Sequence, residues 1–231
     1  MSGGLQRILS IGLGVALLSG TAQADGAVAP AAPWPDSFTT RLEALALLQS
    51  LNADLLSHDS ATLTLDRWCD AHHLASPAKI VAELDHATKK EPTAEQRQLL
   101  HVSATEPIRY RRVKLACGSY VLSEADNWYV PSRLTPEMNK ALDTTDIAFG
   151  RAVQALHFQR HTLSATLLWS PLPQGWETGA PIPAASGATL QIPHEVLQHR
   201  AFLTAADGSP FSEVVETYTS AVLAFPAPAQ H

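Results

Sequence analysis

Apolar residues recur at helical spacing in the first third of the chain. Five leucines lie three or four residues apart, at Leu42, Leu45, Leu48, Leu51 and Leu55. This period predicts an amphipathic helix, and a capping box over residues 40–43 marks its expected start. A short helix is expected over residues 63–73. Another is expected to begin at the capping box of residues 93–96.

The pattern changes to strict alternation in the middle of the chain. Residues 108–117 predict a strand with apolar side chains on one face and polar ones, Arg112 among them, on the other. Gly118 and Ser119 supply a tight turn, and residues 120–130 predict the antiparallel return strand. The two segments together therefore predict a β-hairpin.

A mixed segment and a second hairpin complete the pattern. Thr135 followed by Pro136 predicts a helix to about residue 142, and residues 147–156 predict another. A strand is expected over residues 162–169, and a long Pro- and Gly-rich loop follows over residues 171–193. Two further strands are expected over the ranges listed here: 196–205 and 210–221. Strands joined by hairpins indicate an antiparallel sheet, hence an α+β fold.

The amino terminus has the features of a secretory signal peptide. Arg7 precedes an apolar run over residues 8–18, and small residues at Ala22 and Ala24 fit a cleavage site after Ala24. An uncleaved anchor is the alternative, although the run is shorter than the roughly 20 residues that span a bilayer. We therefore expect a periplasmic or secreted protein that leaves the membrane after cleavage.

The expected organisation is a single folded domain with short flanks. The ranges are a signal peptide over 1–24, an Ala/Pro linker over 25–36, the domain over 37–225 and a tail over 226–231. A formal net charge of −6 argues against nucleic acid as a partner, because such proteins need a basic face. We expect a monomer.

The two cysteines, Cys69 and Cys117, allow two interpretations. In an oxidising compartment they can form a disulfide. Alternatively, both are small buried apolar residues, as free cysteines often are. The sequence does not give the distance between them, so both interpretations stay open.

Motifs for common cofactors and metals are absent from the sequence. It contains no P-loop, no G-x-S-x-G, no C-x-x-C and no H-E-x-x-H. His157 and His161 have helical spacing but no third ligand at a fitting distance in sequence. We therefore expect neither a metal nor an organic cofactor.

Two charged residues in the middle of expected strands are candidates for function. Arg112 lies in the first hairpin and Glu216 in the second. A charge buried without a partner is costly, so such residues either serve a site or lie on a wet face of the sheet as cross-strand ion pairs. Both interpretations apply before any family resemblance is considered.

Several short segments, in order, resemble the chorismate pyruvate-lyase family and its relatives, the effector-binding (UTRA-type) domains of transcription regulators. They are residues 58–62, 112–117, 128–131, 149–151 and 208–210, the last followed by Glu216. The resemblance covers residues 48–222. It implies a single antiparallel sheet of about six strands, with helices on one face and helical flaps over a buried ligand site, in agreement with the α+β order.

The resemblance also assigns roles to individual residues. It implies that Arg112 binds a ligand carboxylate and that Glu216 is the catalytic acid–base residue. It further implies that Phe149 and Gly150 contact the ligand through their backbone and that Ala61 lies at the first flap. No metal or organic cofactor is implied.

Three hypotheses of function follow. The first is an exported carbon–oxygen lyase that eliminates pyruvate from chorismate or a related carboxylated ring. The second is a non-catalytic protein that binds a small carboxylate, such as an aromatic acid, on the same fold. The third is an exported structural or interaction protein that keeps only the scaffold.

Overall fold

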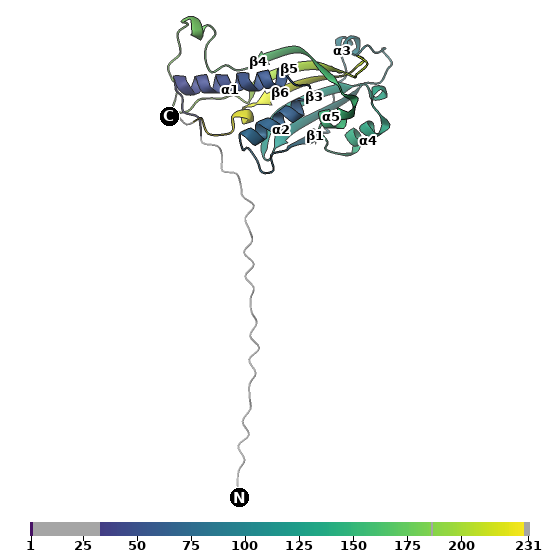
Figure 1. Cartoon of the computed structure of the whole chain (residues 1–231), viewed down its shortest axis with the longest axis horizontal. Coiled ribbons are helices and arrows are strands. Elements are labelled where there is room, and N and C mark those ends of the chain that lie inside the picture. Colours follow the sequence, from purple (N-terminus) through teal and green to yellow (C-terminus); the bar gives the residue numbers. More distant parts are fainter. Residues whose placement is uncertain (2–32, 186, 229–231) are drawn as a thin grey trace.

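The described part of the chain forms an α+β structure around one open sheet (Figure 1). The computed structural model describes residues 1, 33–185 and 187–228. The expected signal peptide, most of the linker and the last three residues of the tail lie outside the described residues. The expected fold class, an antiparallel sheet with helices, is confirmed.

Six antiparallel strands pair in the order β1-β2-β3-β6-β5-β4. The strands are β1 (Ile80–Asp85), β2 (Arg109–Cys117), β3 (Tyr120–Tyr129), β4 (Gln159–Leu167), β5 (Glu195–Thr204) and β6 (Pro210–Thr219). Both expected hairpins, β2–β3 and β5–β6, are confirmed. In the first, Gly118 adopts φ +57°, a left-handed conformation that glycine accepts without strain.

Strand β1 was not expected from the sequence. Its six residues contain two acids and lack flanking signals of a hairpin turn. Its pairing with residues 112–117 of β2 supplies the backbone partners that a short strand needs. Tertiary pairing, rather than local pattern, therefore determines this strand.

The helices lie mainly on one face of the sheet, which we call the inner face (Figure 1). They are α1 (Phe38–Leu56), α2 (Ala61–Ala71), α3 (Ala94–Leu99), α4 (Pro136–Thr144) and α5 (Phe149–Ala152). The inner face and the helices enclose the main hydrophobic core. Among the described residues, no helix combines the length and apolarity needed to cross a bilayer.

Several helix boundaries differ from those expected. Helix α1 is capped by Ser37, and Thr40 is the third helical residue, whose hydroxyl accepts a hydrogen bond from the Ser37 N–H. Ser60 caps α2, which therefore begins at Ala61. The expected helix over residues 147–156 is divided into α5 and a short 3-10 turn. The expected caps at Thr93 and Thr135 are confirmed.

A disulfide joins the helical layer to the sheet. Cys69 of α2 and Cys117 at the end of β2 are bonded, and their Cα atoms lie 6.2 Å apart. The structure therefore agrees with the disulfide interpretation and not with two free buried cysteines. The cross-link attaches α2 to β2, the two elements that carry much of the pocket described next.

Candidate functional site

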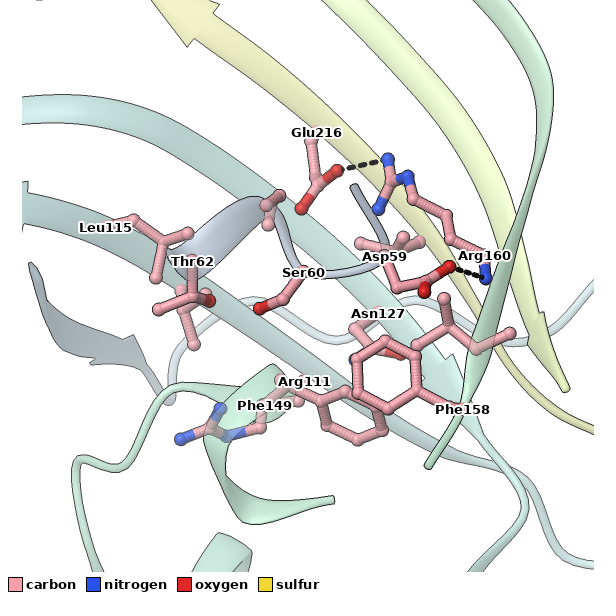
Figure 2. Close-up of a pocket in the computed structure, with 16 residues that line it drawn as sticks. Asp59, Ser60, Thr62, Arg111, Leu115, Asn127, Phe149, Phe158, Arg160 and Glu216 are labelled. Carbon is pink, nitrogen blue, oxygen red and sulfur yellow. Dashed lines mark hydrogen bonds and ion pairs between the residues drawn. The ribbon is translucent and has the colours of Figure 1, made fainter. Parts of the chain in front are cut away.

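A pocket lies between the inner face of the sheet and the beginnings of α2 and α5 (Figure 2). Its cavity volume is about 50 Å³. Its lining is apolar for the most part, with four charged side chains. The lining residues are Asp59, Ser60, Ala61, Thr62, Arg111, Val113, Leu115, Ala125, Asn127, Phe149, Gly150, Phe158, Arg160, Leu203, Val214 and Glu216.

Arg111 of β2 is a buried cation that lacks a carboxylate partner among the described residues. It is 6% exposed, and its Nη2 donates to the Ile147 carbonyl at 2.7 Å. Its Nε and Nη1 have no hydrogen-bond partner within the described structure. Burial lowers the pKa of Arg111 below its usual value. A buried guanidinium with two unpartnered nitrogens can bind an anion through charge-assisted hydrogen bonds.

Arg160 and Glu216 form a buried ion pair at the other side of the pocket. Arg160 Nη2 lies 2.6 Å from Glu216 Oε2, and the two side chains are 5% and 7% exposed. The Tyr218 hydroxyl donates to the same oxygen at 3.3 Å. Burial is the largest single influence and lowers the pKa of Arg160, but the charge and hydrogen bond of Glu216, with further contributions from Tyr218 and Asp59, together raise it above its usual value. Glu216 is therefore held beside a permanent cation.

The wall of the pocket nearest solvent is made by the residues that begin α2 and α5. Asp59 Oδ1 accepts a hydrogen bond from the Arg160 backbone N–H at 2.8 Å. A Cβ on Gly150 would lie 3.0 Å from Ser60 Oγ, so this close approach favours glycine. A second cleft of about 250 Å³ lies beyond, and Asp59, Ser60, Gly150 and Phe158 line both spaces. These residues therefore separate the pocket from the outer cleft.

Arg112 and Glu216, which the resemblance assigns to one ligand site, do not line the same cavity. Arg112 lies on the opposite face of the sheet, where its guanidinium is 3.0 Å from Asp126, 2.8 Å from Glu124 and 3.6 Å from Asp85. Asp126 and Asp85 are its register partners on the two flanking strands. The cross-strand ion pair, the simpler interpretation of this residue, is what the structure contains.

Side-chain alternation explains the error. Successive residues of a strand point to opposite faces, so Arg111 and Arg112 cannot both reach the pocket. Arg111 shares its face with Val113, which lines the pocket. The resemblance to the lyase family names Arg112, whereas the arginine that lines the pocket is Arg111, one position earlier. The apolar face of β2 was the signal that could have corrected it.

The other expected site residues lie at the pocket. Glu216, Phe149, Gly150 and Ala61 all line it. Their catalytic and binding roles stay predictions. Sequence reasoning missed the pocket residues Arg111, Asp59, Asn127 and Arg160; it missed Arg160 because β4 begins at residue 159 rather than 162.

A buried histidine lies close to the ion pair. His199 is fully buried, and its Nε2 is 2.8 Å from Asn52 Oδ1. Burial, with a further contribution from Arg160, lowers the pKa of His199 to about 4, although Glu216 opposes the shift. His199 is therefore neutral at pH 7. No cluster of three potential metal ligands occurs among the described residues.

Comparison with known proteins gives one curated relative of high identity. The chain is 59% identical over 196 residues to the uncharacterized protein y4mC of Sinorhizobium fredii, covering 84% of this chain and 83% of the relative. No protein-family model matches the chain.

Solved structures resemble the chain only distantly. PhnF of Mycobacterium smegmatis is 11% identical with a TM-score of 0.45, covering 76% of this chain and 70% of PhnF. Its separately solved effector domain is 9% identical with a TM-score of 0.42, covering 71% and 96%. The ligand-binding domain of a putative GntR-family transcriptional regulator from Bordetella bronchiseptica is 11% identical with a TM-score of 0.39, covering 61% and 82%.

Proposed function

This chain belongs to the same family as the y4mC protein of Sinorhizobium fredii, and we propose that it binds a small organic carboxylate in the pocket beside Arg111. The observation that carries the proposal is the buried guanidinium with two unpartnered nitrogens. Leaving buried donors unpaired costs about 1–3 kcal/mol each, and more for a charged group. A carboxylate that accepts both donors offsets this cost.

The remainder of the pocket suits the body of such a ligand. Phe149 and Phe158 present aromatic rings, and Val113 and Leu115 form an apolar floor. Ligand sites of this kind are mostly apolar, with a few polar groups that fix orientation. An aromatic or other planar acid fits this lining.

The pocket must widen to admit a ligand of this class. Its volume of about 50 Å³ is well below the roughly 300–1,000 Å³ of ordinary ligand sites. One wall, where Ser60 lies against Gly150, is shared with the outer cleft. We propose that this wall is the route by which the ligand enters.

The test compares two neighbouring arginines. Calorimetric titration of the purified protein with benzoate, 4-methylbenzoate and 4-hydroxybenzoate should detect binding. Arg111→Met should weaken it by about 10- to 100-fold, the value of a hydrogen-bonded ion pair. The control Arg112→Met removes a neighbouring charge on the other face and should bind as the wild type does. Equal affinity in both variants, or no binding by the wild type, would contradict the proposal.

Lyase activity is a second candidate, favoured by one observation. Glu216 Oε1 accepts no hydrogen bond from the described residues, and it points toward the pocket interior (Figure 2). A carboxylate in that position could take a ring proton from chorismate as pyruvate leaves, giving 4-hydroxybenzoate. Incubation with chorismate should then produce 4-hydroxybenzoate, and Glu216→Gln should reduce the rate by about 100-fold or more. No product from the wild type would leave only the binding function.

We also propose that the chain is exported. The amino-terminal pattern ending at Ala24 supports this, and so does the Cys69–Cys117 disulfide, since disulfides persist mainly in oxidising compartments. Protein recovered from a periplasmic fraction should begin at Asp25 by amino-terminal sequencing. A cytoplasmic chain with Met1 intact would contradict the proposal.

A further inference from the structure

We propose that the ligand is an amino-carboxylate, with its carboxylate at Arg111 and a protonated amine beside Asp59 and Glu216. This inference rests on the proposed function and names the class of compound that the same pocket takes. It follows from the charges of the pocket, from their positions and from their existing partners.

The charged side chains of the pocket do not all neutralise one another. Four charged side chains line the pocket: Asp59, Arg111, Arg160 and Glu216. Arg160 and Glu216 neutralise each other at 2.6 Å. Two opposite charges remain: that of Arg111, which has no carboxylate partner among the described residues, and one net negative charge shared by Asp59, Arg160 and Glu216, because the charge of Asp59 also acts on Arg160. A ligand that matches both carries one charge of each sign.

The two remaining charges lie on opposite sides of the pocket (Figure 2). In Figure 2 the Arg111 guanidinium lies across the pocket from Asp59, Arg160 and Glu216. The anionic end of a ligand at Arg111 therefore faces away from the two carboxylates. Its opposite end meets Glu216 Oε1 and Asp59 Oδ2, neither of which accepts a hydrogen bond from the described residues. Two carboxylate oxygens that accept no hydrogen bond from the described residues favour an ammonium group as the donor.

The acidic side of the pocket, at Asp59, is partly open to solvent. Asp59 lines both the pocket and the outer cleft and is itself exposed. An ammonium beside Asp59 therefore keeps part of its hydration, whereas the carboxylate at Arg111 is desolvated but paired. A second carboxylate on the ligand would instead meet the net negative charge of Asp59, Arg160 and Glu216, which opposes its binding. The arrangement therefore selects against dicarboxylates.

The test uses benzoates that differ only at the position opposite the carboxylate. Calorimetric titration of the purified protein compares 4-methylbenzoate, 4-(hydroxymethyl)benzoate, 4-(aminomethyl)benzoate and terephthalate. The aminomethyl compound should bind about 10-fold or more tightly than the methyl compound, which corresponds to about 1.4 kcal/mol. Terephthalate should bind most weakly.

Variants identify the group that is responsible. Asp59→Asn should bring the ratio of the aminomethyl and methyl affinities close to one. The control Asp70→Asn removes the same charge from an exposed position of α2 outside the pocket and should keep the wild-type ratio. An unchanged ratio in Asp59→Asn would overturn the inference.

Other outcomes separate this inference from the function on which it rests. If the methyl and aminomethyl compounds bind equally and both require Arg111, the carboxylate site stands and the amine site is wrong. If the hydroxymethyl compound equals the aminomethyl one, a neutral donor is sufficient and the ammonium is wrong. If no benzoate binds the wild type, both proposals fail together.

Discussion

Arg111 and Arg112 are adjacent in sequence and have opposite surroundings. Arg112, on the outer face, contacts Asp85, Glu124 and Asp126. Arg111, on the inner face, is 6% exposed and leaves two nitrogens without partners among the described residues. The guanidinium of Arg112 thus has carboxylate partners from its own chain, whereas that of Arg111 has none among the described residues. A buried cation without a carboxylate partner is a better marker of a binding site than a cation held in a network of ion pairs.

The energetic difference points the same way. The Arg112 side chain is 26% exposed, so solvent screens its ion pairs, and such pairs contribute at most about 1 kcal/mol. Burying Arg111 costs free energy that the apo protein does not recover. Stability alone would therefore favour an apolar residue at position 111 and is nearly indifferent to position 112.

The largest expected effect concerns Arg160, the arginine of the pocket that forms a buried ion pair. Arg160→Met should lower the free energy of unfolding by roughly 3–5 kcal/mol, because Glu216 is left as a buried charge without its partner. Urea denaturation measures this change. The double variant Arg160→Met with Glu216→Leu should recover a large part of the loss. If it recovers none, packing rather than charge explains the single variant.

A pH effect should come from His199. Its pKa is about 4 in the folded protein and near 6.5 when unfolded, so the unfolded chain binds more protons between these values. Stability should therefore be complete above about pH 6.5 and fall by roughly 3 kcal/mol as the pH decreases toward 4. His199→Gln should flatten this part of the stability–pH curve. A curve of unchanged slope would show that other groups cause the dependence.

The smallest effects test the comparison of the two arginines itself. Arg112→Met should lower the free energy of unfolding by no more than about 1 kcal/mol, and less at high salt. Arg111→Met should leave stability unchanged or raise it, because an unpaired buried charge is removed. Chemical denaturation of both variants is the measurement. If Arg111→Met is the more destabilising of the two, the inner arginine is structural and the comparison is wrong.

The sequence predicts what local chemistry determines. The hairpin around Gly118 and the caps at Thr93 and Thr135 follow from turn and capping residues and are confirmed. Strand β1 was missed because its existence depends on pairing with β2. The same holds for Arg160, whose inward position depends on where β4 begins.

The candidate site was predicted in part, and the error has a definite size. Phe149, Gly150 and Glu216 line one cavity, but the arginine that lines it is Arg111 rather than Arg112. In a strand, a shift of one residue exchanges the two faces, so a small alignment error becomes a complete reversal of environment. A family resemblance carried by short segments does not fix register to that accuracy.

The disulfide also gives the molecule a particular covalent topology. Cys69 and Cys117 are 48 residues apart, so the bond closes a ring that contains β1 and α3. Within the ring, residues 86–93 form neither helix nor strand, and Lys89 and Lys90 are exposed there. A protease that cuts after either lysine opens the ring without dividing the molecule. The nicked protein should therefore migrate as one band on a gel without reductant and as two bands once the bond is reduced.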